Sequence, residues 1–244
     1  MEDAFQIQPE LRYGAPVCDE ILIGRYFTVG YSWYFRQAKW TIEIINRNDY
    51  LLTEAERMNN FRADIRIPQR FRAGLSEFSG SGYDRGHLVA SANNDILDIQ
   101  NSETFLLSNM SPQKPNFNRI IWRELEQAVR TLNNHEDILE TYVLTCPAFY
   151  FDRLIETIGD DDDDLGIDIP IPHAFIKSIL AEDKRGKLQL WTFEMDNQEL
   201  DGNLEDYLVV TYDAEQIVGG RFWDRISGGD IHEQKSNPIA MWDY

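Results

Sequence analysis

The residues best suited to chemistry lie in one segment, residues 79–126. Asp84 is followed by Arg85-Gly86-His87, and a neutral histidine is a suitable general base for an attacking water. The neighbouring arginine can bind two phosphate oxygens at once. Further along, Asn118 and Glu126 offer side-chain oxygens, the ligands that Mg²⁺ prefers while it keeps several waters. Together these groups predict hydrolysis of a phosphodiester.

One helix is expected to carry both oxygen ligands. Pro115 suits the first helical position. Because four residues advance a helix only slightly past one turn, Asn118, Trp122 and Glu126 are predicted to share one face and to look into one cleft. An adjoining apolar stripe at helical spacing predicts the buried face: Ile121, Leu125, Val129 and Leu132.

The rest of the chain shows mostly strand patterns separated by loops. β-Branched and aromatic runs predict strands at 21–23, 26–29, 31–35, 40–45, 103–108, 140–145, 173–180, 188–195 and 207–212. The runs flanking residues 36–39 and 184–187 predict hairpins. The alternating aromatic residues before residue 45 indicate core more than a base-stacking platform. A short helix is predicted from Asp213 to Gly219, and residues 47–78 predict a long ordered loop with at most one helical turn near Thr53–Arg57.

Charge is distributed unevenly along the 244 residues, whose net charge is -19. Residues 1–132 hold 15 basic and 17 acidic residues, whereas residues 133–244 hold 8 and 25. Arginines outnumber acidic residues between Arg57 and His87, which predicts either a local basic groove or a solvated surface. Five consecutive aspartates, Asp160–Asp164, predict an exposed loop, because like charges cannot pack together. The regular spacing of a calcium loop is absent, which disfavours a calcium site there.

No stretch indicates a membrane span, a signal peptide or a transit peptide, so we expect a cytoplasmic protein, with export by a non-cleaved route left open. Cys18 and Cys146 form no metal motif, and a single disulfide between them stays open. No linker divides the chain, which predicts one domain over residues 1–244. Residues 1–16 would be an N-terminal arm and residues 227–244 a C-terminal tail.

The motifs of the central segment resemble the DNA/RNA non-specific endonucleases of the ββα-metal type. The resemblance rests on Asp84-Arg85-Gly86-His87, on Ser108-Asn109 with Pro112-Gln113, and on Asn118 with Trp122, Leu125 and Glu126. It extends upstream through Arg57 and covers roughly residues 29 to 226. The resemblance implies an α+β fold with a central antiparallel sheet flanked by helices, and an endonuclease that hydrolyses DNA, RNA or both.

The resemblance also implies a role for each candidate residue. His87 would be the general base, and Asn118 the direct ligand of one Mg²⁺ or Mn²⁺ per active site. Glu126 would hold metal-bound water, and Asn109 would position the histidine region. Arg57 would contact the phosphate, although Arg62 could replace it. Asp84 and Arg85 would support the site, and Gly86 would allow a tight backbone turn before the histidine.

The expected partner is nucleic acid. A homodimer and an inhibitor or activator protein stay open, because a nuclease without base specificity would endanger its own cell unless its activity were gated. The alternative is a catalytically silent nuclease fold that binds nucleic acid or protein, or a phosphoesterase for small nucleotides. The other histidines have no predicted role in the chemistry: His173 is expected to be structural, and His135 and His232 to lie on the surface.

Overall fold

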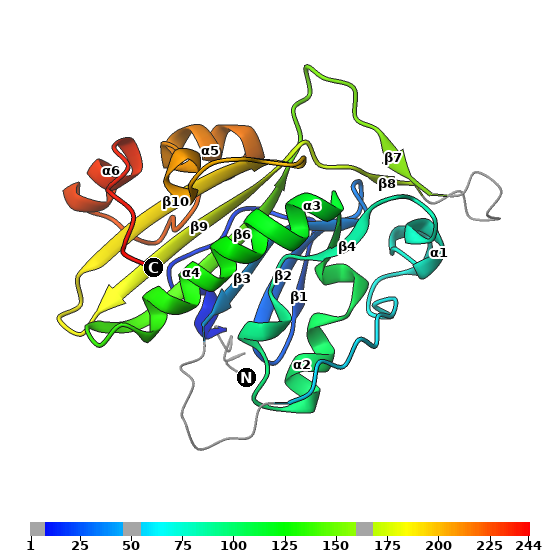
Figure 1. Ribbon diagram of the computed structural model, residues 1–244, viewed down its shortest axis with the longest axis horizontal. Coiled ribbons are helices and arrows are strands. Elements are labelled where there is room, and N and C mark those ends of the chain that lie inside the picture. Colours follow the sequence, from blue (N-terminus) through cyan, green and yellow to red (C-terminus); the bar gives the residue numbers. More distant parts are fainter. Residues whose placement is uncertain (1–7, 46–54, 160–167) are drawn as a thin grey trace, which may run out of the picture.

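The computed structural model describes residues 8–45, 55–159 and 168–244. Its centre is a six-stranded antiparallel sheet with the order β1-β2-β3-β6-β9-β10 (Figure 1). Both predicted hairpins form, since β2 pairs with β3 and β9 with β10. The turn of the first hairpin lies at residues 33–36 and not at 36–39 as predicted, because β2 ends at Ser32 and β3 begins at Gln37. The strands of this sheet are β1 (Glu20–Ile23), β2 (Phe27–Ser32), β3 (Gln37–Ile44), β6 (Ile138–Ala148), β9 (Ala174–Asp183) and β10 (Leu188–Asp196).

Side chains alternate between the two faces of this sheet and build a core on each. One core lies beneath helix α4 (Arg123–Asn134), which crosses the sheet in Figure 1. The other core includes residues of α5 (Thr211–Val218) and α6 (Gly229–Ser236). The strands and helices therefore form the expected α+β architecture, with a central antiparallel sheet flanked by helices.

The predicted helix begins as α3 (Pro115–Phe117), passes through a π-helical turn (Asn118–Trp122) and continues as α4. Its predicted apolar stripe is confirmed, because all four residues are at most 6% exposed. The prediction that Trp122 shares a cleft-facing side of the helix with Asn118 and Glu126 is wrong, since the Trp122 side chain is buried in the core. A π-turn spaces its hydrogen bonds one residue further apart than an α-turn, so Asn118 is not placed by α-helical periodicity.

A separate antiparallel ribbon carries the candidate histidine: β4 (Asp84–His87) pairs with β5 (Met110–Gln113). Gly86 lies inside β4, so the predicted tight turn at this glycine is wrong. Close packing explains the glycine instead, because a Cβ there would lie 2.0 Å from Oε1 of Gln113, which is fully buried.

The remaining elements are short. They are the helices α1 (Leu75–Phe78) and α2 (Asp98–Thr104), the 3₁₀ turns η1 (Pro9–Leu11), η2 (Gln69–Phe71), η3 (Ser91–Asn93), η4 (Leu107–Asn109) and η6 (Leu204–Tyr207), and the strands β7 (Thr157–Ile158) and β8 (Ile169–Pro170). From residue 55 onward the predicted loop is largely irregular, interrupted by η2 and α1.

Two predicted strands are wrong. Residues 103–108 contain the end of α2 and the start of η4, and residues 207–212 contain the end of η6 and the start of α5. Both runs are short and apolar, and such runs do not distinguish a strand from a buried turn or helix end. Helix α5 consequently begins before Asp213, but it ends as predicted at Gly219, whose φ is 63°.

The C-terminal tail forms α6 and then packs across α4. The indole nitrogen of Trp242 donates to the carbonyl oxygen of Ala128 at 2.9 Å, and its ring meets that of Trp191 edge-on. Cys18 and Cys146 are free. Among the residues that the structure describes, no helix has both the length and the apolar character needed to cross a membrane.

Three expectations lie wholly or partly outside the described residues. They are the N-terminal arm before residue 8, the helical turn near Thr53–Arg57, and the loop with Asp160–Asp164. Residues 55–57, the described part of that turn, are not helical.

Candidate active site

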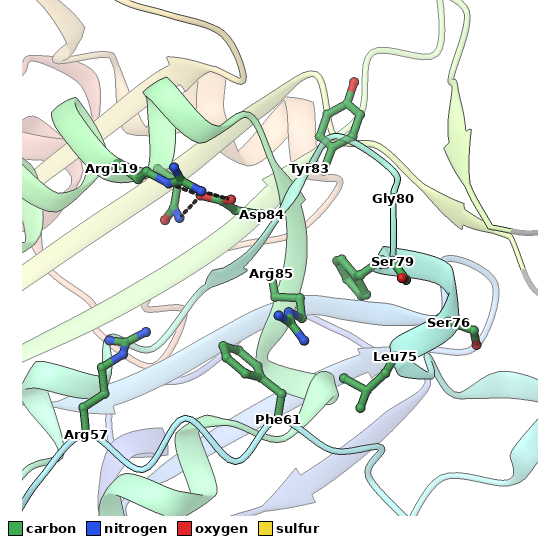
Figure 2. A pocket seen from close by; sticks show the side chains of 12 residues that line it. Arg57, Phe61, Leu75, Ser76, Ser79, Gly80, Tyr83, Asp84, Arg85 and Arg119 are labelled. Carbon is green, nitrogen blue, oxygen red and sulfur yellow. Dashed lines mark hydrogen bonds and ion pairs between the residues drawn. The ribbon is translucent and has the colours of Figure 1, made fainter.

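A cleft of about 800 Å³ lies beside β4, between α1 and the start of the π-helical turn. Figure 2 shows Arg57, Arg85 and Arg119 reaching it from three different segments. We name it the arginine cleft, and its lining residues are Arg57, Phe61, Leu75, Ser76, Phe78, Ser79, Gly80, Tyr83, Asp84, Arg85, Asn118 and Arg119.

The carboxylate of Asp84 joins the ribbon to the helical segment. It accepts hydrogen bonds from Asn118 Nδ2 at 2.9 Å and from Arg119 Nε and Nη2 at 2.8 and 2.6 Å. Burial by itself would raise the pKa of Asp84, but the bonds from Arg119 and Asn118 hold it below its usual value. Asp84 is therefore a stable anion whose oxygens are already engaged.

The side chain of Asn118 has an orientation that fits a metal ligand. Since Nδ2 donates to the acceptor-only carboxylate of Asp84, Oδ1 is not used in that contact. A single amide oxygen supplemented by water suits Mg²⁺ or Mn²⁺, which prefer oxygen ligands. Within the described ranges, no group of three His, Cys, Asp or Glu side chains could hold a metal ion.

His87 lies at the end of β4 with its ring against Phe61 and Phe105. It is 9% exposed, and its Nε2 has no hydrogen-bond partner among the described residues. Burial, reinforced by the positive charge of Arg57, lowers the pKa of His87 from 6.5 to about 3. The imidazole is therefore neutral at physiological pH, as a base must be before it accepts a proton.

The two candidate phosphate-binding arginines have different environments. Arg57 lines the arginine cleft, where Nη1 donates to Ser91 Oγ at 2.6 Å and the guanidinium lies over Phe105. Arg62 instead donates to the backbone oxygens of Asn60 and Ser102 and does not line the cleft. The geometry therefore favours Arg57 over the alternative that the sequence left open.

Not all of the arginines between Arg57 and His87 contribute to the arginine cleft. Arg85 lines the cleft with its guanidinium 4.2 Å from the ring centroid of Phe61. Arg66 is paired with Asp64, and Arg72 donates to a nearby backbone oxygen. Only part of the predicted groove thus reaches the cleft.

Besides His87, two candidate residues lie away from the cleft lining. Asn109 is fully buried and bonds to both backbone groups of Val89, two residues after His87. Glu126 is half-buried on α4, where burial raises its pKa and the charges of Lys177 and Arg130 oppose that shift. The structure therefore brings Arg57, Asp84, Arg85 and Asn118 to one cleft and packs His87 against Phe61 of its lining, whereas Asn109 and Glu126 do not line the cleft that both Asn118 and Glu126 were predicted to face.

Sequence reasoning assigned no role to Arg119 or Phe61. Arg119 directly follows Asn118, but its partner Asp84 is 35 residues away, so no local spacing indicates the pair. Phe61 contacts both His87 and Arg85. The only indication of this role in the sequence is that an aromatic residue stands in a predicted loop.

The remaining histidines behave as expected. His173 is structural, because Nδ1 accepts the backbone N–H of Tyr150 and Nε2 lies 3.0 Å from the carbonyl oxygen of Leu154. His135 and His232 are exposed.

Replacing His87 with glutamine should change how stability depends on pH. Because the folded pKa lies below the unfolded one, the unfolded chain binds the proton first as pH falls. The wild type should therefore lose up to about 1.4 kcal/mol of unfolding free energy per pH unit between pH 6.5 and about 3. Urea unfolding should show the wild type's advantage over His87→Gln growing as pH rises through this range. Exposed His135→Gln is the control, and a pH-independent difference for His87→Gln would contradict the assignment.

Comparison with known proteins places the chain in one family. The family of DNA/RNA non-specific endonucleases matches residues 10–228. Human mitochondrial endonuclease G is 30% identical over 217 residues, which cover 85% of this chain and 71% of that protein. Nuclease C1 of Cunninghamella echinulata var. echinulata is 29% identical over 228 residues, 88% of each chain.

A solved structure described as the EndoG/EndoGI complex has a similar fold. Its TM-score is 0.79 at 29% identity, and the match covers 89% of this chain and 91% of that chain. This similarity confirms the ββα-metal nuclease fold. With the family match over most of the sequence and the named nucleases among its relatives, the chain belongs to the DNA/RNA non-specific endonuclease family and is an endonuclease.

Proposed function

We propose that this endonuclease hydrolyses phosphodiester bonds of DNA, RNA or both with one divalent metal ion, with His87 as general base. The observation that carries the proposal is a cleft lined by arginines and an oriented asparagine amide, with a neutral histidine packed against Phe61, one of its lining residues. Such a set serves the three needs of the reaction, which are to deprotonate water, to neutralise phosphate charge and to stabilise the leaving oxygen.

His87 removes the proton from the attacking water in this proposal. Its depressed pKa keeps the imidazole unprotonated, and the aromatic wall of Phe61 and Phe105 holds the ring in place. Arg57 and Arg85 bind the phosphate oxygens, since a guanidinium presents paired donors to them. Their contacts with aromatic rings reduce the number of conformations available to each guanidinium before substrate arrives.

Asn118 would hold the metal through Oδ1, and Glu126 would hold one of its waters. When bound, Mg²⁺ or Mn²⁺ supplies Lewis-acid stabilisation of charge on the phosphate and leaving oxygens. Asp84 fixes the Asn118 amide so that its oxygen rather than its nitrogen is presented. Asn109 holds the backbone just after His87 and so supports the base indirectly.

Cleavage of supercoiled plasmid and of single-stranded RNA tests the reaction and the sugar preference. The wild type should cut with Mg²⁺ and stop with chelator, and His87→Ala should lose about 10²–10⁴-fold because no general base remains. His135→Ala, which changes an exposed histidine, is the matched control. No cutting by the wild type under any metal condition would favour the catalytically silent fold.

Substitutions of Arg57 and Arg62 should have different effects in the same cleavage assay. Arg57→Ala should lower kcat by about 10²-fold, because a donor to the charged phosphate is lost. Arg62→Ala should mainly lower Tm, because it removes bonds to Asn60 and Ser102 that hold the segment to α2. A larger kcat loss in Arg62→Ala than in Arg57→Ala, at temperatures where both are folded, would reverse the assignment.

We also propose that a protein inhibitor gates this activity. The support is indirect: the similar solved structure is described as a complex that explains the inhibition of EndoG. Overexpression of the wild type alone should then be toxic, whereas His87→Ala should be tolerated at equal protein level. Strong cleavage by the purified chain combined with harmless expression of the wild type would reject the need for a gate.

A further inference from the structure

Three buried asparagines make the same set of hydrogen bonds. Asn101, Asn109 and Asn197 are 2%, 0% and 8% exposed. In each, Oδ1 accepts one backbone N–H, and Nδ2 donates to two backbone carbonyl oxygens. An amide offers two donors and an acceptor in one rigid plane, so each side chain fixes three backbone groups relative to one another.

Asn101 of α2 holds the segment that carries Arg57. Its Oδ1 accepts the N–H of Met58 at 3.0 Å. Its Nδ2 donates to the carbonyl oxygens of Ser91 at 3.0 Å and Asn94 at 3.2 Å. Ser91 is the residue whose hydroxyl accepts from the Arg57 guanidinium. One side chain thus fixes both the backbone next to Arg57 and the backbone of the group that orients its guanidinium.

This contact matters because the local bonds of Arg57, from Nε to Asn59 Oδ1 and from Asn59 Nδ2 to its carbonyl oxygen, join it only to a residue of the same irregular segment. Residues 55–61 lie outside any helix or strand. Without regular structure, the position of the arginine depends on side-chain contacts with neighbouring elements. The bond between Met58 and Asn101 is the contact with α2 closest in sequence to Arg57.

Asn197 makes the equivalent contacts where the helical segment begins. Its Oδ1 accepts the N–H of Lys114 at 2.8 Å. Its Nδ2 donates to the carbonyl oxygens of Pro112, at the end of β5, and Pro172, just before β9. Lys114 immediately precedes α3, and Asn118 follows one turn later. Asn197 therefore fixes the start of the segment that presents the Asn118 amide.

We propose that Asn101 and Asn197 are positioning residues of the active site, Asn101 for Arg57 and Asn197 for Asn118. The proposal rests on the proposed roles of Arg57 and Asn118. Asn109 makes the corresponding bonds behind His87, so each of the three groups has its own asparagine. Neither proposed residue lines the arginine cleft, and both act only through the backbone that they hold.

Plasmid cleavage should show different defects for substitutions of Asn101 and Asn197. Asn101→Leu has nearly the same volume but lacks every amide bond, and it should lower kcat by about 100-fold without changing the Mg²⁺ concentration for half-maximal rate. Adding Arg57→Ala to it should cost little more, because coupled residues are not additive. Asn197→Leu should instead raise the Mg²⁺ requirement.

Thr192→Val is the matched control for lost buried hydrogen bonds. Its hydroxyl bonds to Ser178 and Thr211 on the face of the sheet opposite α4. It should lower Tm and leave kcat and the Mg²⁺ requirement unchanged at temperatures where it is folded.

If Asn101→Leu does not fold, Asn101→Asp replaces it in the test, because this variant keeps the acceptor for Met58 but loses both donors. An unchanged kcat in Asn101→Asp would overturn the role of Asn101.

Hydrogen exchange distinguishes failure of this inference from failure of the proposed function. In the wild type the Met58 amide should be protected, and Asn101→Leu should remove that protection while the Val89 amide stays protected. Met58 protection that survives in Asn101→Leu would overturn the inference whether or not the protein cuts. A fully additive loss on combining Asn101→Leu with Arg57→Ala would also overturn it, whereas metal-independent cleavage by the wild type would contradict the proposed function alone.

Discussion

The geometry of the active site depends on the carboxylate of Asp84. This residue begins the strand that ends at His87, and it accepts hydrogen bonds from Asn118 and Arg119 on the helical segment. Charge-assisted bonds of this kind are short and directional. Pairing within the ribbon sets Asp84 opposite Gln113, five residues before Asn118, and so brings the two segments close together. The carboxylate of Asp84 then joins them and fixes the direction in which the Asn118 amide points.

Beneath α4, charged side chains replace part of an apolar core. Lys177 is 2% exposed, donates to Thr145 at 2.9 Å and lies 4.4 Å from the ring centroid of Trp122. Glu43 accepts from Asn93 and Asn94, and burial raises its pKa to about 7. Because buried charges are costly unless partners satisfy them, these groups restrict how α4 and the segment after His87 can sit on the sheet. Polar contacts thus add a directional constraint that apolar packing lacks.

The arginine cleft is basic on a strongly acidic protein. Arg119 is paired with Asp84, whereas Arg57 and Arg85 lie over the rings of Phe105 and Phe61. Salt screens charges beyond about 8–10 Å, so arginines in contact with a phosphate dominate over the distant acidic half of the chain. The net charge of -19 still opposes the accumulation of nucleic acid over the surface as a whole. Binding would therefore be concentrated at the cleft.

Local patterns predicted much of this protein. The buried stripe of α4 and both hairpins follow from periodicity, because helical and strand geometry repeat over a few residues. Residue types and motifs also indicated which groups could perform phosphodiester chemistry. Tertiary structure decided which arginines reach the cleft, since Arg62 bonds to Ser102 and Arg119 to Asp84 across tens of residues. Tertiary structure also determined that the helix forms a π-turn at Asn118 and that residues 103–108 form a helix end and a 3₁₀ turn and not a strand. Periodicity reports only a residue's own segment, whereas a polar side chain is oriented by whichever distant donor or acceptor the fold brings to it.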